Sequence, residues 1–161
     1  MNGKIVGGFL VVTALVAGIA MYWLQVYAFY EPVSFTPGDE IRLTPIESAM
    51  PEAIVAENVS GIDGTSSPLR FRACFTTPLT QAMLSETYRA YANPVPTIAP
   101  SWFDCFDADA IGAALEKGEA LAFLSQESIS PQIDRVVAVF PDGRAYAWHQ
   151  VQPEKAEGIE N

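Results

Sequence analysis

Residues 5–30 form an uncharged apolar run, IVGGFLVVTALVAGIAMYWLQVYAFY. A helix needs roughly 20 apolar residues to cross the hydrocarbon core of a bilayer, and residues 5–24 supply that length. The polar side chain of Thr13 is tolerated there, because a helical threonine can bond back to its own backbone. Aromatic rings favour the headgroup level, and four of them cluster at the end of the run: Tyr22, Trp23, Tyr27 and Tyr30. We therefore predict a cytoplasmic N-terminus and one transmembrane anchor within residues 1–30.

The orientation of this anchor depends on few charges. Lys4 is the one basic residue before the apolar run, and the positive-inside rule then favours a cytoplasmic N-terminus. Arg42 follows closely enough on the far side to weaken that count. A cleaved signal peptide is the alternative, because Gly18-Ile19-Ala20 resembles a small-x-small cleavage site. The apolar run continues past Ala20 without a polar stretch, which favours an uncleaved anchor.

The anchor also carries small residues on one helical face. Gly3 and Gly7 form a GxxxG spacing, and Ala14 and Gly18 form a second small-xxx-small pair. Small residues let two membrane helices approach closely. We predict that this face packs on a partner helix; an ordinary lipid-facing helix is the alternative.

Every charged residue except Lys4 lies at or after Glu31, and the chain has a net charge of −10. This acidic balance argues against binding to nucleic acid or to anionic lipid headgroups, because both need positive charge. It fits a soluble domain that stays apart from the membrane surface, or one with a basic partner.

The two cysteines, Cys74 and Cys105, are too far apart for a CxxC redox or metal motif. In an oxidising compartment such a pair commonly forms a structural disulfide, which would contribute roughly 3–4 kcal/mol for a loop of this length. Two buried free thiols are the alternative. The disulfide favours a domain outside the cytoplasm.

The fold expected after the anchor is α+β: a small antiparallel-rich sheet of four to six strands with two packed helices. We expect a proline-rich neck at residues 31–51, a periplasmic domain at residues 52–152 and a polar tail at residues 153–161. Strands are predicted at residues 40–43, 53–59, 69–75, 119–124, 135–140 and 144–151, with a loop at 61–64. Helices are predicted from Thr77-Pro78 through Tyr91 and from Asp107 to Gly118. Alternation places Cys74 opposite Phe71 and Phe75.

Residues that could carry chemistry are few. His149 is the only histidine, and a lone strand histidine is more often a structural or surface residue than a catalytic one. Asp104, Asp107 and Asp109 lack the glycine and distal glutamate of a calcium loop, and helix capping by Asp107 explains them more simply. We therefore predict no catalytic residues, no metal and no cofactor.

Two groups of residues are candidates for binding. Arg70 and Arg72 project from one strand face and could contact an anion; pairing with nearby acidic residues is the alternative. The stretch NPVPTIAPSWFDCF at residues 93–106 combines stiff prolines with Trp102, Phe103 and Phe106. Aromatic side chains on a pre-ordered loop suit a protein interface, whereas the alternative is that they cover the core.

The segments MNGKIVGGFLVVTALVAGIAMYWLQVYAFYEP, RFRACFTTP and PSWFDCFDADAIGAALEKGEA resemble uncharacterised single-span membrane proteins of Rhodobacter-like alphaproteobacteria. The resemblance covers almost the whole chain. It implies a Gram-negative inner membrane and a periplasmic domain, and it supplies no function and no catalytic residues.

These features favour a non-enzymatic accessory or assembly protein of an inner-membrane complex, a respiratory complex being one candidate. Its partner would be a protein of the inner membrane, reached through the span and the domain. A ligand-binding or sensory periplasmic ectodomain is the second hypothesis, and it requires a pocket with convergent polar groups.

Overall fold

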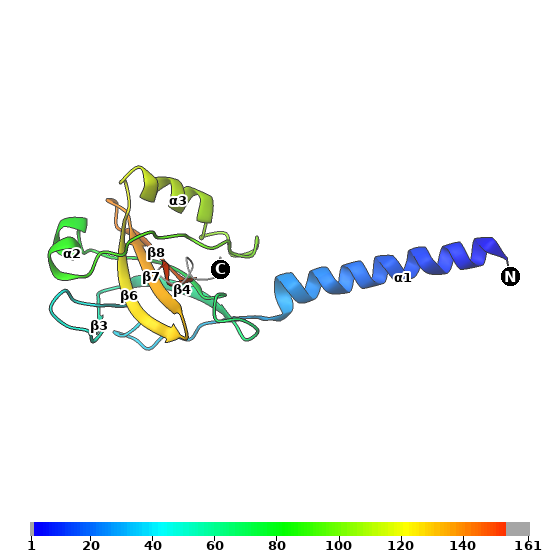
Figure 1. The fold of residues 1–161 in the computed structure, drawn as a ribbon, viewed down its shortest axis with the longest axis horizontal. Coiled ribbons are helices and arrows are strands. Elements are labelled where there is room, and N and C mark those ends of the chain that lie inside the picture. Colours follow the sequence, from blue (N-terminus) through cyan, green and yellow to red (C-terminus); the bar gives the residue numbers. More distant parts are fainter. Residues whose placement is uncertain (1, 154–161) are drawn as a thin grey trace, which may run out of the picture.

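The apolar run forms a long helix that projects away from the rest of the chain (Figure 1). Helix α1 (Gly3–Trp23) continues into a stretch of π-helix, η1 (Leu24–Ala28). These 26 residues are long and apolar enough to cross a membrane, with a mean hydropathy of 2.2 in their most apolar window. The structure, a computed structural model, describes residues 2–153; the predicted tail from residue 154 onward lies outside the described residues.

A six-stranded antiparallel sheet forms the centre of the domain, in the order β1-β4-β5-β8-β7-β6. Its strands are β1 (Tyr30–Pro32), β4 (Glu57–Gly64), β5 (Arg72–Thr76), β6 (Leu121–Ser130), β7 (Ile133–Val139) and β8 (Arg144–Val151). A turn at Pro141-Asp142-Gly143 joins β7 to β8, with Gly143 at φ +87°. A second, two-stranded sheet pairs β2 (Arg42–Leu43) with β3 (Glu52–Ala53). With two short helices, α2 (Gln81–Thr87) and α3 (Ala108–Glu116), the α+β prediction is confirmed.

Residues 31–51, expected as a neck outside the domain, instead belong to the folded unit. β1 pairs with β4 at the edge of the main sheet, a position where Pro32 is tolerated because an edge strand need not donate every backbone N–H. Ile41 and Leu43 are 3% and 0% exposed. The prolines exclude a long helix from this segment, but they allow β1 and β2 to pair with strands of the domain. The predicted domain boundary at residue 52 is therefore wrong.

Two predicted boundaries in the next segment are also wrong. The strand expected at residues 53–59 is divided between β3 and β4, and β4 runs through the loop expected at 61–64. Asn58 adopts φ +53° at an irregularity in the β4–β5 register, which a propensity argument does not detect. Gly61 lies within β4, and the ring of Phe35 occupies the space that a side chain at this position would need.

Helix α2 begins three residues later than Thr77-Pro78 indicated. Thr80 is the N-cap residue and accepts a hydrogen bond from the backbone N–H of Met83 at 3.3 Å. The Thr77 hydroxyl instead donates to the Val55 carbonyl at 2.8 Å, so a tertiary contact replaced the predicted cap. The helix ends before Tyr88, which is extended and bridges to Pro45. Helix α3 matches its prediction, because Asp107 caps it through the N–H of Ala110 at 3.0 Å.

The sheet buries both of its faces. One face packs on residues of the 33–56 segment around Phe71, Ala73 and Phe75. The other packs beneath α3 and contains Trp148 and Cys74. Figure 1 shows α3 above the sheet and β3 below it. A disulfide joins Cys74 to Cys105 with a Cα–Cα distance of 6.3 Å, so the predicted pairing and the predicted face of Cys74 are confirmed.

Candidate functional site

The end of the apolar N-terminal helix, the predicted anchor, contacts the domain through Trp102. Its indole Nε1 donates a hydrogen bond to the Val26 carbonyl at 2.8 Å. The indole ring stacks on Tyr27, with centroids 6.2 Å apart, and meets Tyr30 edge-on at 5.9 Å. The π-helical turn η1 leaves the Val26 carbonyl free for this contact because the chain is about to leave the helix. The anchor and the domain are therefore in direct contact.

The other two aromatic residues of the predicted partner loop lie in the core. Phe103 is 8% exposed and Phe106 is 5% exposed, and Phe106 packs edge-on against Tyr146 and Trp148. Phe106 is held in place by its neighbour Cys105. This placement matches the alternative stated above, in which the aromatics cover the core, and of the three aromatic residues it leaves only Trp102 partly exposed.

Residues 93–106, which we call the proline strap, are tied to the sheet by buried polar side chains. The Gln150 side-chain carbonyl accepts a hydrogen bond from the Val95 N–H at 2.8 Å, and its amide donates to the Asn93 carbonyl at 3.2 Å. The Thr97 hydroxyl donates to the His149 carbonyl at 3.3 Å. The strap thus carries Trp102 to the anchor on a fixed path.

Arg72, predicted as an anion contact, is instead a buried structural residue. It is 4% exposed, and its guanidinium donates to the backbone carbonyls of Leu69, Phe71, Thr97 and Ile98 at 2.6–3.0 Å. Burial lowers the pKa of Arg72 to about 10, and the nearby Tyr30 and Asp63 oppose that shift. Its donors are directed at the chain's own backbone, so the prediction of an anion contact is wrong for Arg72.

Arg70 lies beside it but is bound differently. Its guanidinium carbon lies 5.0 Å from the centroid of the Tyr30 ring and 5.8 Å from that of Phe29. Its Nη1 atom is buried without a hydrogen-bond partner. The structure therefore separates the two arginines that the strand pattern had grouped together.

The histidine lies inside the domain beside Arg135. His149 is 3% exposed, stacks on Phe71 with centroids 4.6 Å apart, and has its Nδ1 2.6 Å from the Pro68 carbonyl. Burial and the adjacent Arg135 lower its pKa to about 3. A buried neutral imidazole whose two nitrogens are both engaged is a structural element.

The small-residue face of the anchor is open in this structure. A side chain added at Gly3, Gly7 or Gly18 would meet nothing within 4 Å. Ala14 lies on the same face and is exposed. The small-residue face is therefore uncovered along α1 from Gly3 to Gly18.

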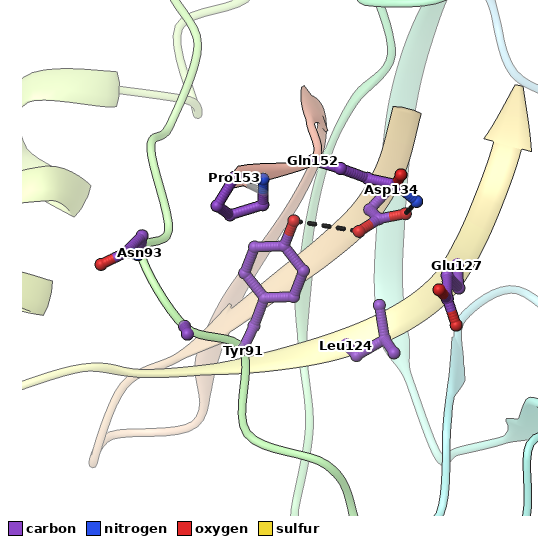
Figure 2. Close-up of a pocket in the computed structure, with 8 residues that line it drawn as sticks. Tyr91, Asn93, Leu124, Glu127, Asp134, Gln152 and Pro153 are labelled. Carbon is purple, nitrogen blue, oxygen red and sulfur yellow. Dashed lines mark hydrogen bonds between the residues drawn. The ribbon is translucent and has the colours of Figure 1, made fainter. Parts of the chain in front are cut away.

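A cavity of about 380 Å³ lies beside Tyr91, between β6, β7 and the start of the proline strap (Figure 2). The Tyr91 hydroxyl donates to Asp134 at 3.0 Å, and Gln152 donates to the same carboxylate at 2.8 Å. Burial and the neighbouring Asp134 raise the pKa of Tyr91. Figure 2 shows Glu127 at the opposite side of this cavity. Among the described residues, no group of three His, Cys, Asp or Glu side chains is arranged to hold a metal ion.

Comparison with known proteins gives a family match for most of the domain. Residues 41–158 match the model of a family of unknown function, DUF6446. The chain belongs to this family. No curated protein matches the chain, and no solved structure matches it.

Within this DUF6446 member, sequence reasoning missed the role of Trp102 as the link to the anchor. A tryptophan between Ser101 and Phe103 carries no local signal for a bond to a carbonyl 76 positions earlier. It also missed Gln150 and Asp134, which are polar residues in strands and are 4% and 5% exposed. Their burial becomes apparent only when the strap and the β6–β7 hairpin are placed over them.

Proposed function

We propose that this DUF6446 protein is a non-enzymatic accessory or assembly protein of a bacterial inner-membrane complex, a respiratory complex being one candidate. Its N-terminus is cytoplasmic and its domain periplasmic. The observation that carries the proposal is the contact of Trp102 with Val26 and Tyr27. That contact sets the direction of the domain relative to the span.

A fixed junction favours docking on one large partner. If the span and the domain were joined by a flexible linker, binding through both would cost the conformational freedom of that linker. Here the hydrogen bond and the ring stack have already restricted it. The open faces of Gly7 and Gly18 would let a helix of the same partner approach the span closely. Both features support a protein that binds through its span and its domain together.

The proposed compartment is supported by two features. A disulfide between Cys74 and Cys105 persists in an oxidising compartment. Lys4 before the span favours retention of the N-terminus in the cytoplasm. A phosphatase fused to the C-terminus would be active in the periplasm, and an active cytoplasmic reporter at the same position would contradict this orientation.

The test of function is recovery of a partner. Tagged full-length protein, purified from native membranes in mild detergent, is expected to carry one or more inner-membrane proteins in stoichiometric amount. Gly7→Leu and Gly18→Leu should reduce that recovery by filling the open face. Val16→Leu, on the opposite side of the helix, is the matched control and should leave recovery unchanged. Absence of any stoichiometric partner for the wild-type protein would contradict the proposal.

A ligand-binding ectodomain is the second candidate, supported by the cavity beside Tyr91. The carboxylates of Asp134 and Glu127 give that cavity an acidic lining, which suits a small cationic or hydroxylated ligand. Thermal-unfolding screens with such compounds would detect one that stabilises the domain. Tyr91→Phe would then reduce the stabilisation, and equal stabilisation of the variant would exclude this cavity as the binding site.

A further inference from the structure

Arg70 is held at the point where the anchor enters the domain. Its guanidinium lies over the rings of Tyr30 and Phe29. Its aliphatic stem packs directly over Gly64, because a Cβ added there would collide with the Arg70 side chain. The charged head is therefore positioned on aromatic rings that directly follow the end of η1.

The guanidinium of Arg70 lacks an acceptor within the described residues. Arg42, Arg72, Arg89, Arg135 and Arg144 each donate at least one hydrogen bond. Arg70 donates none to another described residue, and its Nη1 is buried. A buried charged donor without an acceptor costs free energy. Nη1 is out of reach of an outside group, but Arg70 as a whole is only half-buried, so an anion beside the rest of the guanidinium would compensate its charge.

The position of Arg70 favours one class of anion. If the anchor spans a membrane, the aromatic rings of Tyr27, Tyr30 and Trp102 lie at the headgroup level. Phospholipid phosphates lie at the same depth. The planar guanidinium suits bidentate recognition of a phosphate. We propose that the junction between anchor and domain binds the phosphate group of a phospholipid through Arg70, a site that rests on the membrane-anchored part of the proposed function.

The acidic charge of the chain does not oppose this contact. Glu31 in β1 pairs with Asp63 in β4. Glu31 follows Tyr30 in its strand and Asp63 precedes Gly64, and Tyr30 and Gly64 both contact Arg70. Successive side chains in a strand point to opposite faces, so alternation places both carboxylates on the sheet face opposite Tyr30. Asp63 acts electrostatically on Arg72, and among the described residues neither carboxylate forms an ion pair with Arg70. The site is a single local contact, which a zwitterionic phospholipid can satisfy, and it needs no broad positive surface.

The proposal can be tested by lipid binding to the full-length protein. The protein is delipidated in maltoside micelles and titrated with phosphatidylethanolamine or with a phosphate-free diglucosyl diacylglycerol, and bound lipid is counted by native mass spectrometry. The wild type is expected to prefer the phospholipid. Arg70→Gln should weaken that binding about tenfold or more, the size of one charge-assisted hydrogen bond. Arg70→Lys should retain part of it.

Arg144→Gln is the matched control, because Arg144 pairs with Asp142 in the β7–β8 turn, and it should bind like the wild type. Equal binding of both lipids, or wild-type binding by Arg70→Gln, would overturn the proposal. Displacement of the phospholipid by millimolar inorganic phosphate would overturn its assignment to lipid. Far-UV circular dichroism shows whether Arg70→Gln is folded, and Arg70→Lys serves as the test variant where it is not. Partner recovery is measured separately, so lipid binding without a partner would contradict only the accessory role.

Discussion

The Nε of Arg135 donates a hydrogen bond to the Nε2 of His149 at 2.9 Å. A guanidinium has donors and no acceptor, so this bond requires Nε2 to be unprotonated. Nδ1 then carries the proton and donates to the Pro68 carbonyl at 2.6 Å. The pair therefore fixes one neutral tautomer of the imidazole, and protonation would place two cations side by side in the domain interior.

The pH dependence of stability follows from this tautomer. The pKa of His149 is lowered to about 3 in the folded domain, below its unfolded value of about 6.5. Between these pH values the imidazole is protonated in the unfolded chain and neutral in the folded domain. The neutral His149 therefore makes its full contribution to stability above about pH 6.5, and this contribution is lost as the pH falls. From this residue alone, the free energy of unfolding should decrease by about 1.4 kcal/mol for each unit by which the pH falls within this range.

Denaturant unfolding of wild type and His149→Gln, followed by tryptophan fluorescence across that pH range, would measure this effect. Carboxylates titrate in both proteins, so the difference between the two isolates the histidine. The stability advantage of the wild type is expected to shrink as the pH is lowered. An imidazole that titrates near pH 6.5 in the folded protein by NMR would contradict the prediction.

A second prediction concerns Arg72 as a clamp between β5 and the proline strap. Its guanidinium satisfies the carbonyls of Thr97 and Ile98 on the strap as well as two carbonyls near β5. Arg72→Met keeps the stem but removes every donor. We expect a loss of at least about 3 kcal/mol in the free energy of unfolding, because several buried carbonyls lose their partner. Arg144→Met, at an exposed ion pair, should change stability little.

The sequence predicted well what short-range patterns determine. Alternation in β5 placed Cys74 opposite Phe71, and the carboxylate of Asp107 identified the start of α3. It failed where a distant contact prevailed over a local preference. Thr77 bonds to Val55 in place of capping a helix, and β1 joins the sheet although prolines follow it. For the candidate site, Arg70 and Arg72 have the same chemistry in the sequence, and only tertiary contacts distinguish them: Arg72 bonds to the proline strap, whereas Arg70 lies over Tyr30.

The disulfide gives a third prediction. Cys74 and Cys105 are separated by 31 positions, and cross-linking a loop of that size contributes roughly 3–4 kcal/mol by restricting the unfolded chain. Cys74→Ala/Cys105→Ala should therefore lower stability by about that amount. Neither thiol of the wild-type protein should react with an alkylating reagent until a reductant is added. Rapid alkylation of the untreated folded protein would show that the bridge is absent.

The fourth prediction concerns the coupling of the anchor to the domain through Trp102. Trp102→Phe keeps a ring against Tyr27 but loses the hydrogen bond to the Val26 carbonyl. One such bond contributes about 1 kcal/mol, so opening of the junction should become about fivefold more frequent. Trp102→Ala removes the stack as well and should have a larger effect. Opening exposes the aromatic residues of the junction, and chymotrypsin cleavage there in detergent would report it.

Trp23→Phe is the control for this measurement, because the Trp23 side chain is exposed on α1 and its loss leaves the junction intact. Cleavage rates should rise in the order wild type, Trp102→Phe, Trp102→Ala, with Trp23→Phe close to the wild type. Partner recovery should fall in the same order if the fixed direction of the domain matters for docking. Faster cleavage with undiminished recovery would separate the two effects: the junction would then be a stabilising contact, and the partner would recognise the span or the domain independently of their relative direction.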